Sequence, residues 1–391
     1  MLGRPDVDLL AGDFFVEDAR TAYRWFRDHE PVFHDEANDL WGIATYDGVR
    51  TAGHDGATFS SALGSRPEAG PMPWMIDMDG AAHSKRRRLV SGGFTPARVR
   101  ATEPQVRGIC HDLIDRVCEQ GTCDVVADVA APLPMIVIGD MLGVAATDRE
   151  QLIRWSHGML ASLTGEPAGF EAAAVAFGEY VEYAHRVIAA RRAQPGDDLF
   201  STLVHAEVDG EGLSDDDIVF ESLLLLIGGD ETTRHVTASG VDLLLEHRSQ
   251  MAELAADPVL MPAAVEEVLR WVSPIKSMAR TTTRATELEG ASLAAGTKVV
   301  LLYESANFDD RQFDEPERFD IRRSPNEHVA FGFGPHVCLG ASLARLEVQT
   351  MLDCILQRLP DLERATDAPL TRSITGLDRL PVCFTPTAVG R

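Results

Sequence analysis

The sequence predicts a mainly α-helical protein with small β-sheets, built as one domain around a long central helix. Apolar residues recur at helical spacing through most of the chain after residue 80, whereas strand-like runs are short and scattered. No stretch rich in Pro, Gly or Ser is long enough to mark a linker. We therefore expect residues 1–391 to form a single domain, although length alone favours two or three domains of roughly 150 residues each.

The expected elements can be placed in chain order. Segments with an apolar face opposite a charged face are expected to be helical: residues 111–117, 149–155, 170–192 and 214–248. Short runs rich in β-branched or aromatic residues are expected to be strands: residues 39–46, 298–303 and 381–386. A further helical run covers residues 341–359.

The helix expected over residues 214–248 is unusually long. Ser214 is a good N-cap, and three aspartates follow it in the first turn, where the helix dipole favours negative charge. Roughly 35 residues at ~1.5 Å per residue span ~50 Å, the width of the whole molecule. Its centre, residues 223–227, is apolar on nearly every side. We therefore expect this part to be buried and to form a wall of a cofactor pocket.

The charge balance excludes one class of partner. The chain has 36 Lys and Arg against 61 Asp and Glu, which gives a formal net charge of −25. Binding to nucleic acid depends on neutralising phosphates with basic side chains, so we expect no nucleic-acid partner. The hydrophobic fraction of 45% and the charged fraction of 25% are typical of a soluble globular protein.

We find no segment typical of export or membrane insertion. The first twenty residues are rich in charged side chains, unlike a signal peptide. The most apolar stretch, residues 129–139, has about half of the ~20 residues that a transmembrane helix needs, and prolines interrupt it. The six cysteines form no CxxC pair, which fits a reducing compartment better than a disulfide framework. We expect a cytoplasmic protein without a membrane anchor.

The strongest chemical signal is the sequence FGFGPHVCLG at residues 331–340, which directly precedes a helical run. Its glycines allow a tight loop whose backbone can approach a ligand closely. Cys338 lies just before the expected helix start, where amide donors and the helix dipole stabilise a thiolate. A thiolate ligates iron, and a cysteine ligand favours O–O cleavage in haem enzymes. The loop therefore points to a haem-thiolate centre.

Other interpretations of this loop stay open from the residues alone. A lone cysteine near a helix is more often a small buried hydrophobic side chain, which is how we interpret the other five cysteines. The glycine pattern is a poor dinucleotide-binding fingerprint, because Val337 stands where the last glycine belongs. Residues 340–344 resemble a nucleophile elbow but lack its final glycine.

The pattern Phe-x-x-Gly-x-x-x-Cys-x-Gly resembles that of the cytochrome P450 monooxygenases of the soluble bacterial type. Three further motifs stand in the order and at the separations that this family shows, so the resemblance covers essentially the whole chain. It implies a P450 fold centred on haem b, with Cys338 as the ligand of the iron. It also implies that the loop binds the haem through Phe331, Gly334, His336, Cys338 and Gly340.

A second motif, GGDETT at residues 228–233, lies in the long helix. Two glycines in mid-helix cost ~1 kcal/mol each relative to alanine. A hydroxyl side chain there can bond to a backbone carbonyl and make room for a small ligand. The alternative is a packing glycine pair beside a solvated acid. The resemblance implies that Glu231 and Thr232 form the acid–alcohol pair that relays protons to dioxygen at the haem, with Asp230 as a neighbour.

Glu267 and Arg270 stand three residues apart, so they can pair on one face of a helix. Taken alone, such a pair is usually a surface salt bridge of little energetic value. The resemblance implies a buried structural pair completed by an arginine from a later irregular segment, which we place at Arg318. We assign these three residues to folding and to the integrity of the haem pocket, with no chemical role.

The two propionates of a haem need cationic partners. The resemblance places these partners at His83 and Arg87 on one early helix, at Arg280, and at His336 in the cysteine loop. Taken singly, each of them is better interpreted as a solvated surface residue. The spacing of the whole set is what supports the prediction.

The resemblance also assigns walls to a substrate pocket: residues 67–76, 158–165, 225–229 and 274–278. These segments carry few charges and several methionines, which suits a bulky hydrophobic substrate such as a steroid, terpenoid or polyketide. Some stretches look particularly like actinobacterial enzymes that hydroxylate the terminal side-chain carbon of cholesterol or cholestenone: residues 131–135, 226–235 and 304–309.

The chain has no flavin or iron–sulfur motif, so its electrons must come from a partner. One segment contains seven basic residues and one acidic residue, Glu103, a local charge of +6: Lys85, Arg86, Arg87, Arg88, Arg98, Arg100 and Arg107. A run of charge is often only a solvated face. We expect this patch to steer and dock an acidic ferredoxin, which a ferredoxin reductase would reduce.

The leading interpretation is a monomeric monooxygenase that uses dioxygen to hydroxylate an unactivated C–H bond of a hydrophobic substrate. Hydroxylation of a terpenoid or polyketide in a biosynthetic pathway is one alternative. A peroxide-driven peroxygenase is another, but relatives of that kind usually lack the acid–alcohol pair found at Glu231 and Thr232. The same pair disfavours a non-catalytic haem-binding or ligand-binding protein.

Overall fold

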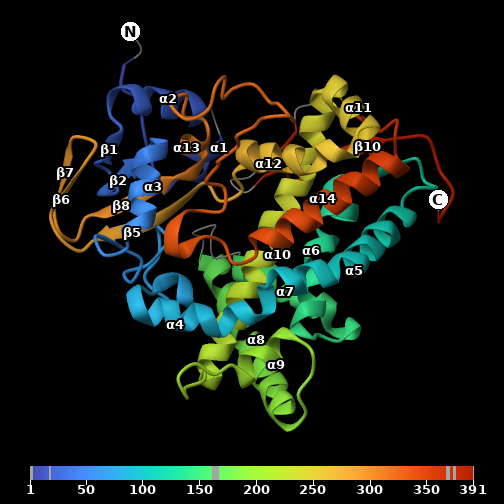
Figure 1. The fold of residues 1–391 in the computed structure, drawn as a ribbon, viewed down its shortest axis with the longest axis horizontal. Helices are drawn as coiled ribbons and strands as arrows, with labels where there is room; N and C mark the ends of the chain where they lie inside the picture. The colour runs from blue at the N-terminus through green and yellow to red at the C-terminus, as the bar shows by residue number, and fades with distance from the viewer. Residues whose placement is uncertain (1–2, 17–18, 161–166, 367–369, 373–375, 391) are drawn as a thin grey trace.

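The computed structural model describes residues 3–16, 19–160, 167–366, 370–372 and 376–390. The five-stranded sheet and a two-stranded hairpin lie at one side of the molecule, whereas most helices and the remaining three-stranded sheet lie at the other (Figure 1). The described helices include α1 (Gly12–Val16), α2 (Ala19–His29), α3 (Tyr46–His54), α4 (Gly80–Val90), α5 (Pro96–Asp115), α6 (Pro132–Leu142), α7 (Arg149–Leu160), α8 (Pro167–Ala193), α9 (Leu199–His205), α10 (Asp215–Glu246), α11 (Arg248–Ala256), α12 (Met261–Val272), α13 (Tyr303–Asn307) and α14 (Ala341–Arg358). The predicted fold class, mainly α with small sheets, is confirmed.

The largest sheet joins both ends of the chain. Its strand order is β1 (Val32–Asp35), β2 (Leu40–Ile43), β8 (Lys298–Leu302), β5 (Ser277–Thr282) and β3 (Phe59–Ser60). Pairing is antiparallel except between β2 and β8, where Trp41 lies opposite Val299. The two smaller sheets are β4 (Thr122–Asp124), β10 (Pro381–Cys383) and β9 (Glu363–Arg364), and the hairpin β6 (Thr286–Leu288) and β7 (Ala291–Leu293).

The long helix α10 runs through the middle of the helical part (Figure 1). Ser214 caps it as predicted: its hydroxyl accepts from the Asp217 amide while the Asp217 carboxylate accepts from the Ser214 amide, a capping box. The apolar centre is not buried on every side. Leu223 and Leu226 are buried, whereas Leu224 is only partly covered and Gly228 is exposed. One stripe of α10 therefore faces open space.

The other predicted elements are present: α7 and α8 are longer than expected, whereas α14 ends one residue earlier than expected. The segment predicted at residues 111–117 is only the end of α5, which begins at Pro96 under a Thr95 cap and contains Pro104. Its first turns bury little besides Val99, so their apolar periodicity is weak. Each predicted strand shortens to its sheet-paired residues, as in Lys298–Leu302. The helices α1 to α3 were not predicted.

The apolar segment Val125–Leu142 meets the length and composition expected of a membrane span, with a mean hydropathy of 1.8, yet 61% of it is buried inside the protein. It comprises a π-helical turn, Val125–Ala130, followed by α6. Leu133 and Val137 pack in the core around α5, α10 and α14, while Met135 and Ile138 pack in a second core against α7 and α8. Packing on two sides accounts for its high hydropathy.

Candidate functional site

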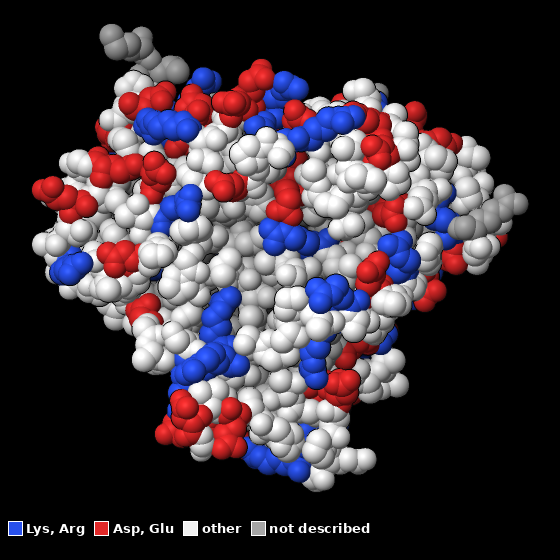
Figure 2. All heavy atoms as spheres, in the orientation of Figure 1, with Lys and Arg blue, Asp and Glu red and all other residues white. Residues whose placement is uncertain are grey.

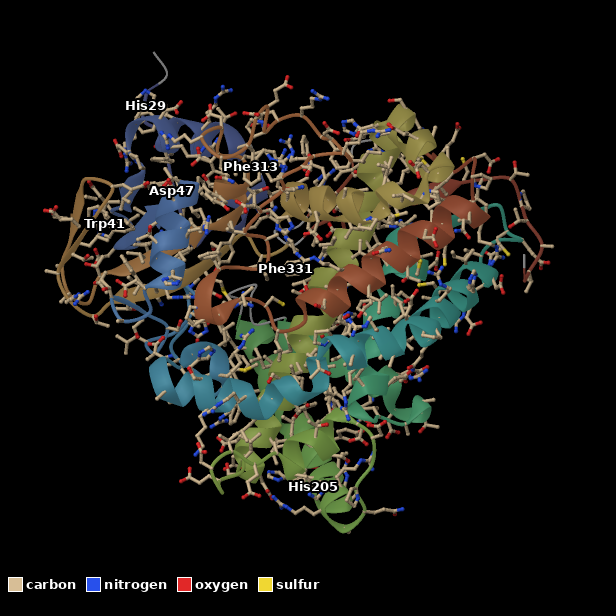
Figure 3. All side chains as sticks on the ribbon, in the orientation of Figure 1. His29, Trp41, Asp47, His205, Phe313 and Phe331 are labelled. Atoms are coloured by element: carbon tan, nitrogen blue, oxygen red, sulfur yellow. The ribbon has the colours of Figure 1, made fainter. Side chains whose placement is uncertain are left out.

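The cysteine loop lies at the centre of the molecule between the large sheet and α14, where Phe331 is labelled (Figure 3). Gly332 and Gly334 have positive φ angles of 70° and 76°. A Cβ at Gly334 would collide with the Gly53 carbonyl oxygen of α3, so only glycine fits there. The Cys338 amide donates to the Phe331 carbonyl at 2.9 Å. These constraints hold Cys338 at the start of α14.

The Cys338 side chain is exposed to solvent and forms no disulfide. The surrounding protein nevertheless raises the pKa of its thiol, although the Gly340 and Ala341 amides and the charges of Arg87 and Arg345 act in the opposite direction. The two amides thus stabilise the thiolate as predicted, but burial outweighs their effect on the pKa. The donor set still suits a metal, because a coordinated cation deprotonates a thiol outright.

Four basic side chains converge beside the loop: His83 and Arg87 on α4, Arg280 on β5, and His336. The His83 and His336 rings lie 4.1 Å apart. Burial, followed by the charges of Arg280, His83 and Arg87, lowers the pKa of His336 to about 3. The sequence prediction that these residues form one set agrees with this placement.

This basic cluster lacks matching anions. Arg280 is 3% exposed, and among the described residues no carboxylate lies within 4 Å of its guanidinium. His83 Nε2 is buried without a hydrogen-bond partner, and Asp79 is the acid nearest the cluster, 3.7 Å from His336 Nε2. The charges of Arg280 and Arg87 oppose protonation of the two histidines, and an anion bound beside them would relieve this repulsion. The residues present therefore fit a haem, whose iron and two propionates would meet Cys338 and this cluster.

The exposed stripe of α10 provides a second wall. A Cβ at Gly228 would meet nothing within 4 Å, whereas one at Gly229 would meet Ile138 of α6 at 3.4 Å. The Thr232 hydroxyl donates to the Gly228 carbonyl at 3.0 Å, as predicted from the motif. Thr232 thus places a hydroxyl next to the open side of the helix.

The Glu231 carboxylate pairs with basic side chains of its own helix. Its Oε1 lies 3.0 Å from Arg234 Nη2 and 3.6 Å from His235 Nε2. Burial acts to raise the pKa of this carboxyl, but the hydrogen bond with His235 and the Arg234 charge outweigh it and lower the pKa. Asp230, in contrast, is 3% exposed and accepts a 2.8 Å hydrogen bond from Ser156 of α7. Burial raises the pKa of Asp230.

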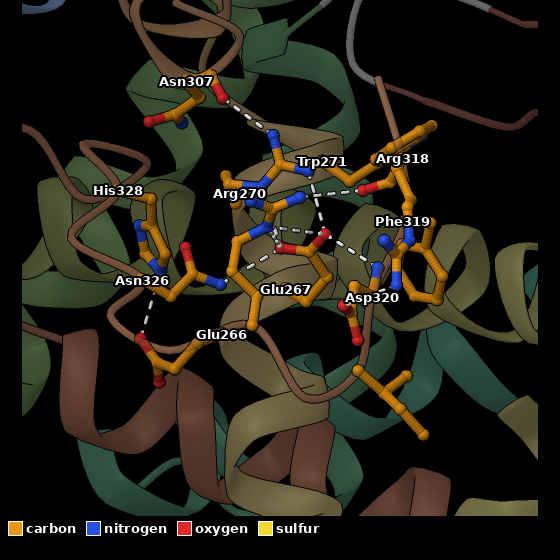
Figure 4. Close-up of polar contacts among 12 residues, drawn as sticks. Glu266, Glu267, Arg270, Trp271, Asn307, Arg318, Phe319, Asp320, Asn326 and His328 are labelled. Atoms are coloured by element: carbon orange, nitrogen blue, oxygen red, sulfur yellow. Dashed lines mark hydrogen bonds and ion pairs between the residues drawn. The ribbon is translucent and has the colours of Figure 1, made fainter. Parts of the chain in front are cut away.

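The predicted structural ion cluster is present with one different member (Figure 4). Arg270 forms two 2.8 Å hydrogen bonds to Glu267, and both side chains are fully buried. The third member is Arg323, whose Nε lies 3.1 Å from Glu267 Oε2. Arg318 is 61% exposed and pairs with Glu315 instead, so its assignment was wrong. The chain bends after residue 318 and brings a later arginine to the acid.

Sequence reasoning missed further partners of Glu267. The Asp320 amide donates to its Oε1 at 3.0 Å, and Asn326 Nδ2 donates to its Oε2 at 3.1 Å. The available signal was the presence of several polar residues in the irregular segment 318–326. That segment has no periodicity from which to choose among them.

The predicted substrate walls are placed only in part. Residues 225–229 lie on α10, and 274–278 lead into β5. Met75 is 6% exposed and packs in the hydrophobic core, whereas Met72 is 38% exposed. Residues 161–165 of the predicted pocket lie outside the described residues.

Most of the basic residues predicted to form a docking patch are already paired. Arg86 binds Asp217 and Glu221, Lys85 binds Glu211, Arg87 donates to Val337, Arg98 pairs with Asp197, and Arg107 pairs with Asp353. Within the described part of the chain, Arg88 and Arg100 are exposed and without an ionic partner. Lys and Arg side chains gather across the middle of the face that carries α4 and α14 (Figure 2).

Comparison with known proteins gives a consistent result. The cytochrome P450 family profile matches residues 75–371. A steroid C26-monooxygenase of Mycolicibacterium smegmatis is 51% identical over 99% of this chain and 98% of its own length. One from Mycobacterium tuberculosis is 50% identical over 99% of both chains. The substrate-free crystal structure of CYP109E1 from Bacillus megaterium has a TM-score of 0.89 at 32% identity, and the match covers 95% of this chain and 99% of that one.

Proposed function

The chain belongs to the cytochrome P450 family, and on that premise we propose that this haem b monooxygenase hydroxylates the terminal side-chain carbon of a steroid. The observation that carries the proposal is the 51% identity, over 99% of the chain, to an enzyme named for oxidation at steroid C26. The open space beside Gly228 on α10 and the partly exposed Met72 are consistent with an apolar site there.

The residues of the site divide the work of holding the cofactor. We assign Cys338 as the iron ligand, His83, Arg87, Arg280 and His336 as partners of the propionates, and Phe331, Gly334 and Gly340 as the loop that admits the ring. Bound haem supplies the oxidising chemistry by activating dioxygen. The protein holds the ligand, balances the propionate charge, and presents Thr232 and Glu231 as proton carriers on α10.

Substrate identity is tested by titrating the haem-loaded protein with cholest-4-en-3-one, cholesterol, a terpenoid and a polyketide. We expect a saturable change in the haem absorbance spectrum with a sterol, because a substrate bound beside the haem would change the surroundings of the iron. Turnover followed by mass spectrometry should then place the new oxygen on the terminal side-chain carbon. Saturation by the terpenoid or polyketide alone would contradict the steroid assignment.

We further propose that a ferredoxin, reduced by its reductase, delivers electrons at the face that carries Arg88 and Arg100. Both are exposed and free to pair with an acidic partner, in contrast to Arg86. The −25 charge would repel such a partner elsewhere and favours a soluble, cytoplasmic monomer. We take residues 1–391 to act as one domain.

Charge reversal tests this docking face. Arg88→Glu should raise the ferredoxin concentration needed for half-maximal reduction by about fivefold at low salt, because exposed charges at an interface mainly govern association. The difference should shrink at high ionic strength. Arg24→Glu is the matched control, since Arg24 is exposed on α2 at the opposite end of the molecule (Figure 1). Equal effects of the two variants would exclude docking at Arg88.

A further inference from the structure

The segment between β3 and α4 is held by buried acidic side chains. Asp77 accepts three hydrogen bonds of 2.8 Å, from the Ser65 amide, the Met72 amide and Trp74 Nε1. Lys298 Nζ donates to the Pro67 carbonyl at 2.9 Å. Hydrogen bonds within the segment therefore hold it together.

Glu221 makes that connection. It lies on α10, is fully buried, and accepts a 2.8 Å hydrogen bond from the Met75 amide in the short helix η1 (Met75–Asp77). The same Oε1 lies 3.3 Å from Arg86 Nη1 of α4. A single carboxyl group thus joins α10, η1 and α4. Its second oxygen, Oε2, is buried with no partner.

The charges around Glu221 do not balance. Arg86 faces it from α4 and also binds Asp217 of α10 at 2.7 Å, so one cation serves two acids. On η1 the acid is Asp77, whose carboxylate is occupied by the segment itself. Burial raises the pKa of Glu221 to about 7, against the opposing effects of Arg86 and the Met75 amide. Glu221 therefore changes charge in the neutral range.

Helical geometry relates this contact to the open stripe of α10. Glu221 lies three residues before Leu224 and seven before Gly228, so all three share one face of the helix. Segment 72–77 is consequently anchored about two turns from the open space beside Gly228. Movement of the segment would change the shape of the site that we assign to the substrate.

We propose that Glu221 is a positioning residue that holds segment 72–77 over the substrate site in its neutral form and releases it on ionisation. The direction follows from linkage. The carboxyl group is harder to ionise when the segment is closed than when the segment is open and the group is solvated. Low pH therefore favours the closed form. Opening becomes easier as the pH rises through neutrality. The link to substrate rests on the proposed function, whereas the anchoring itself does not.

Hydrogen exchange on the haem-loaded protein measures the anchoring directly. After correction for intrinsic exchange, opening of a peptide that contains Met75 should increase about tenfold between pH 6 and pH 8. This factor follows from linkage if the carboxyl group has a pKa of about 7 in the closed form and an ordinary pKa in the open form. Glu221→Gln keeps an acceptor for the Met75 amide without a charge, so its protection should not depend on pH. Glu221→Ala should lose protection at every pH.

The matched control removes the competing acid. Asp217→Asn leaves Arg86 to Glu221 alone, so the transition should move to lower pH. A pH-dependent loss of protection that persists in Glu221→Gln would overturn the proposal. Sterol dissociation constants, measured by the haem spectrum over the same pH range, should rise with opening in the wild type and in Asp217→Asn but not in Glu221→Gln. If exchange changes with pH but sterol affinity does not, Glu221 anchors the segment, and the proposed effect on substrate binding is overturned.

Discussion

Arg323→Ala should lower the free energy of unfolding by about 3 kcal/mol, whereas Arg318→Ala should lower it by less than about 1 kcal/mol. Arg323 is 9% exposed and bonds to Glu267, which is fully buried. Its removal leaves a buried carboxylate with one cation fewer. Arg318 is 61% exposed and pairs at the surface with Glu315. Urea denaturation of the two variants, followed by circular dichroism, compares the losses.

Arg323→Lys separates charge from geometry. Lysine keeps the positive charge but lacks the fork that bonds both Glu267 and the carbonyls of Asp314 and Arg318. We expect this variant to recover less than half of the lost stability. Equal losses for Arg323→Ala and Arg318→Ala would restore the original assignment of Arg318 to the cluster. Loss of the haem spectrum should accompany unfolding rather than precede it, since Arg323 lies outside the proposed haem contacts.

The two arginines also show where prediction from sequence ends. Motifs with fixed spacing placed Cys338, Glu267 and Arg270 correctly, because each lies in or beside a helix whose geometry follows from local periodicity. Arg318 and Arg323 lie in an irregular segment, where tertiary path alone determines which side chain reaches Glu267. No local rule distinguishes arginines five residues apart in such a segment.

The pairing of the basic residues was also not predictable from the sequence. Sequence composition identified a positive segment, but it does not show which charges are neutralised by folding. Arg86 is 14% exposed in its pairs with Asp217 and Glu221, which come from a helix more than a hundred residues later. The same contact contains Glu221, which no motif indicated. An acid within an apolar helix is visible in sequence, but its burial and its contact with the Met75 amide are products of the fold.

Thr232→Val should reduce hydroxylated product formed per electron pair about a hundredfold, because a positioned proton carrier contributes about 10²–10⁴ to rate. Valine matches threonine in shape and removes only the hydroxyl that lies beside Gly228. Sterol affinity should stay within about twofold, since the two side chains have the same shape and neither is charged. Product and hydrogen peroxide are measured against NADPH consumed, and peroxide should account for the missing product.

Matched variants assign the effect to proton transfer at this pair. Thr232→Ser restores a hydroxyl and should recover most of the coupling, while Glu231→Gln should resemble Thr232→Val because an amide carries no transferable proton at neutral pH. Asp230→Asn keeps the hydrogen bond from Ser156, removes a neighbouring acid that faces α7, and should remain coupled. If Asp230→Asn uncouples turnover and Glu231→Gln does not, the relay acid is Asp230. The resting pairing of Glu231 with Arg234 would then be purely structural.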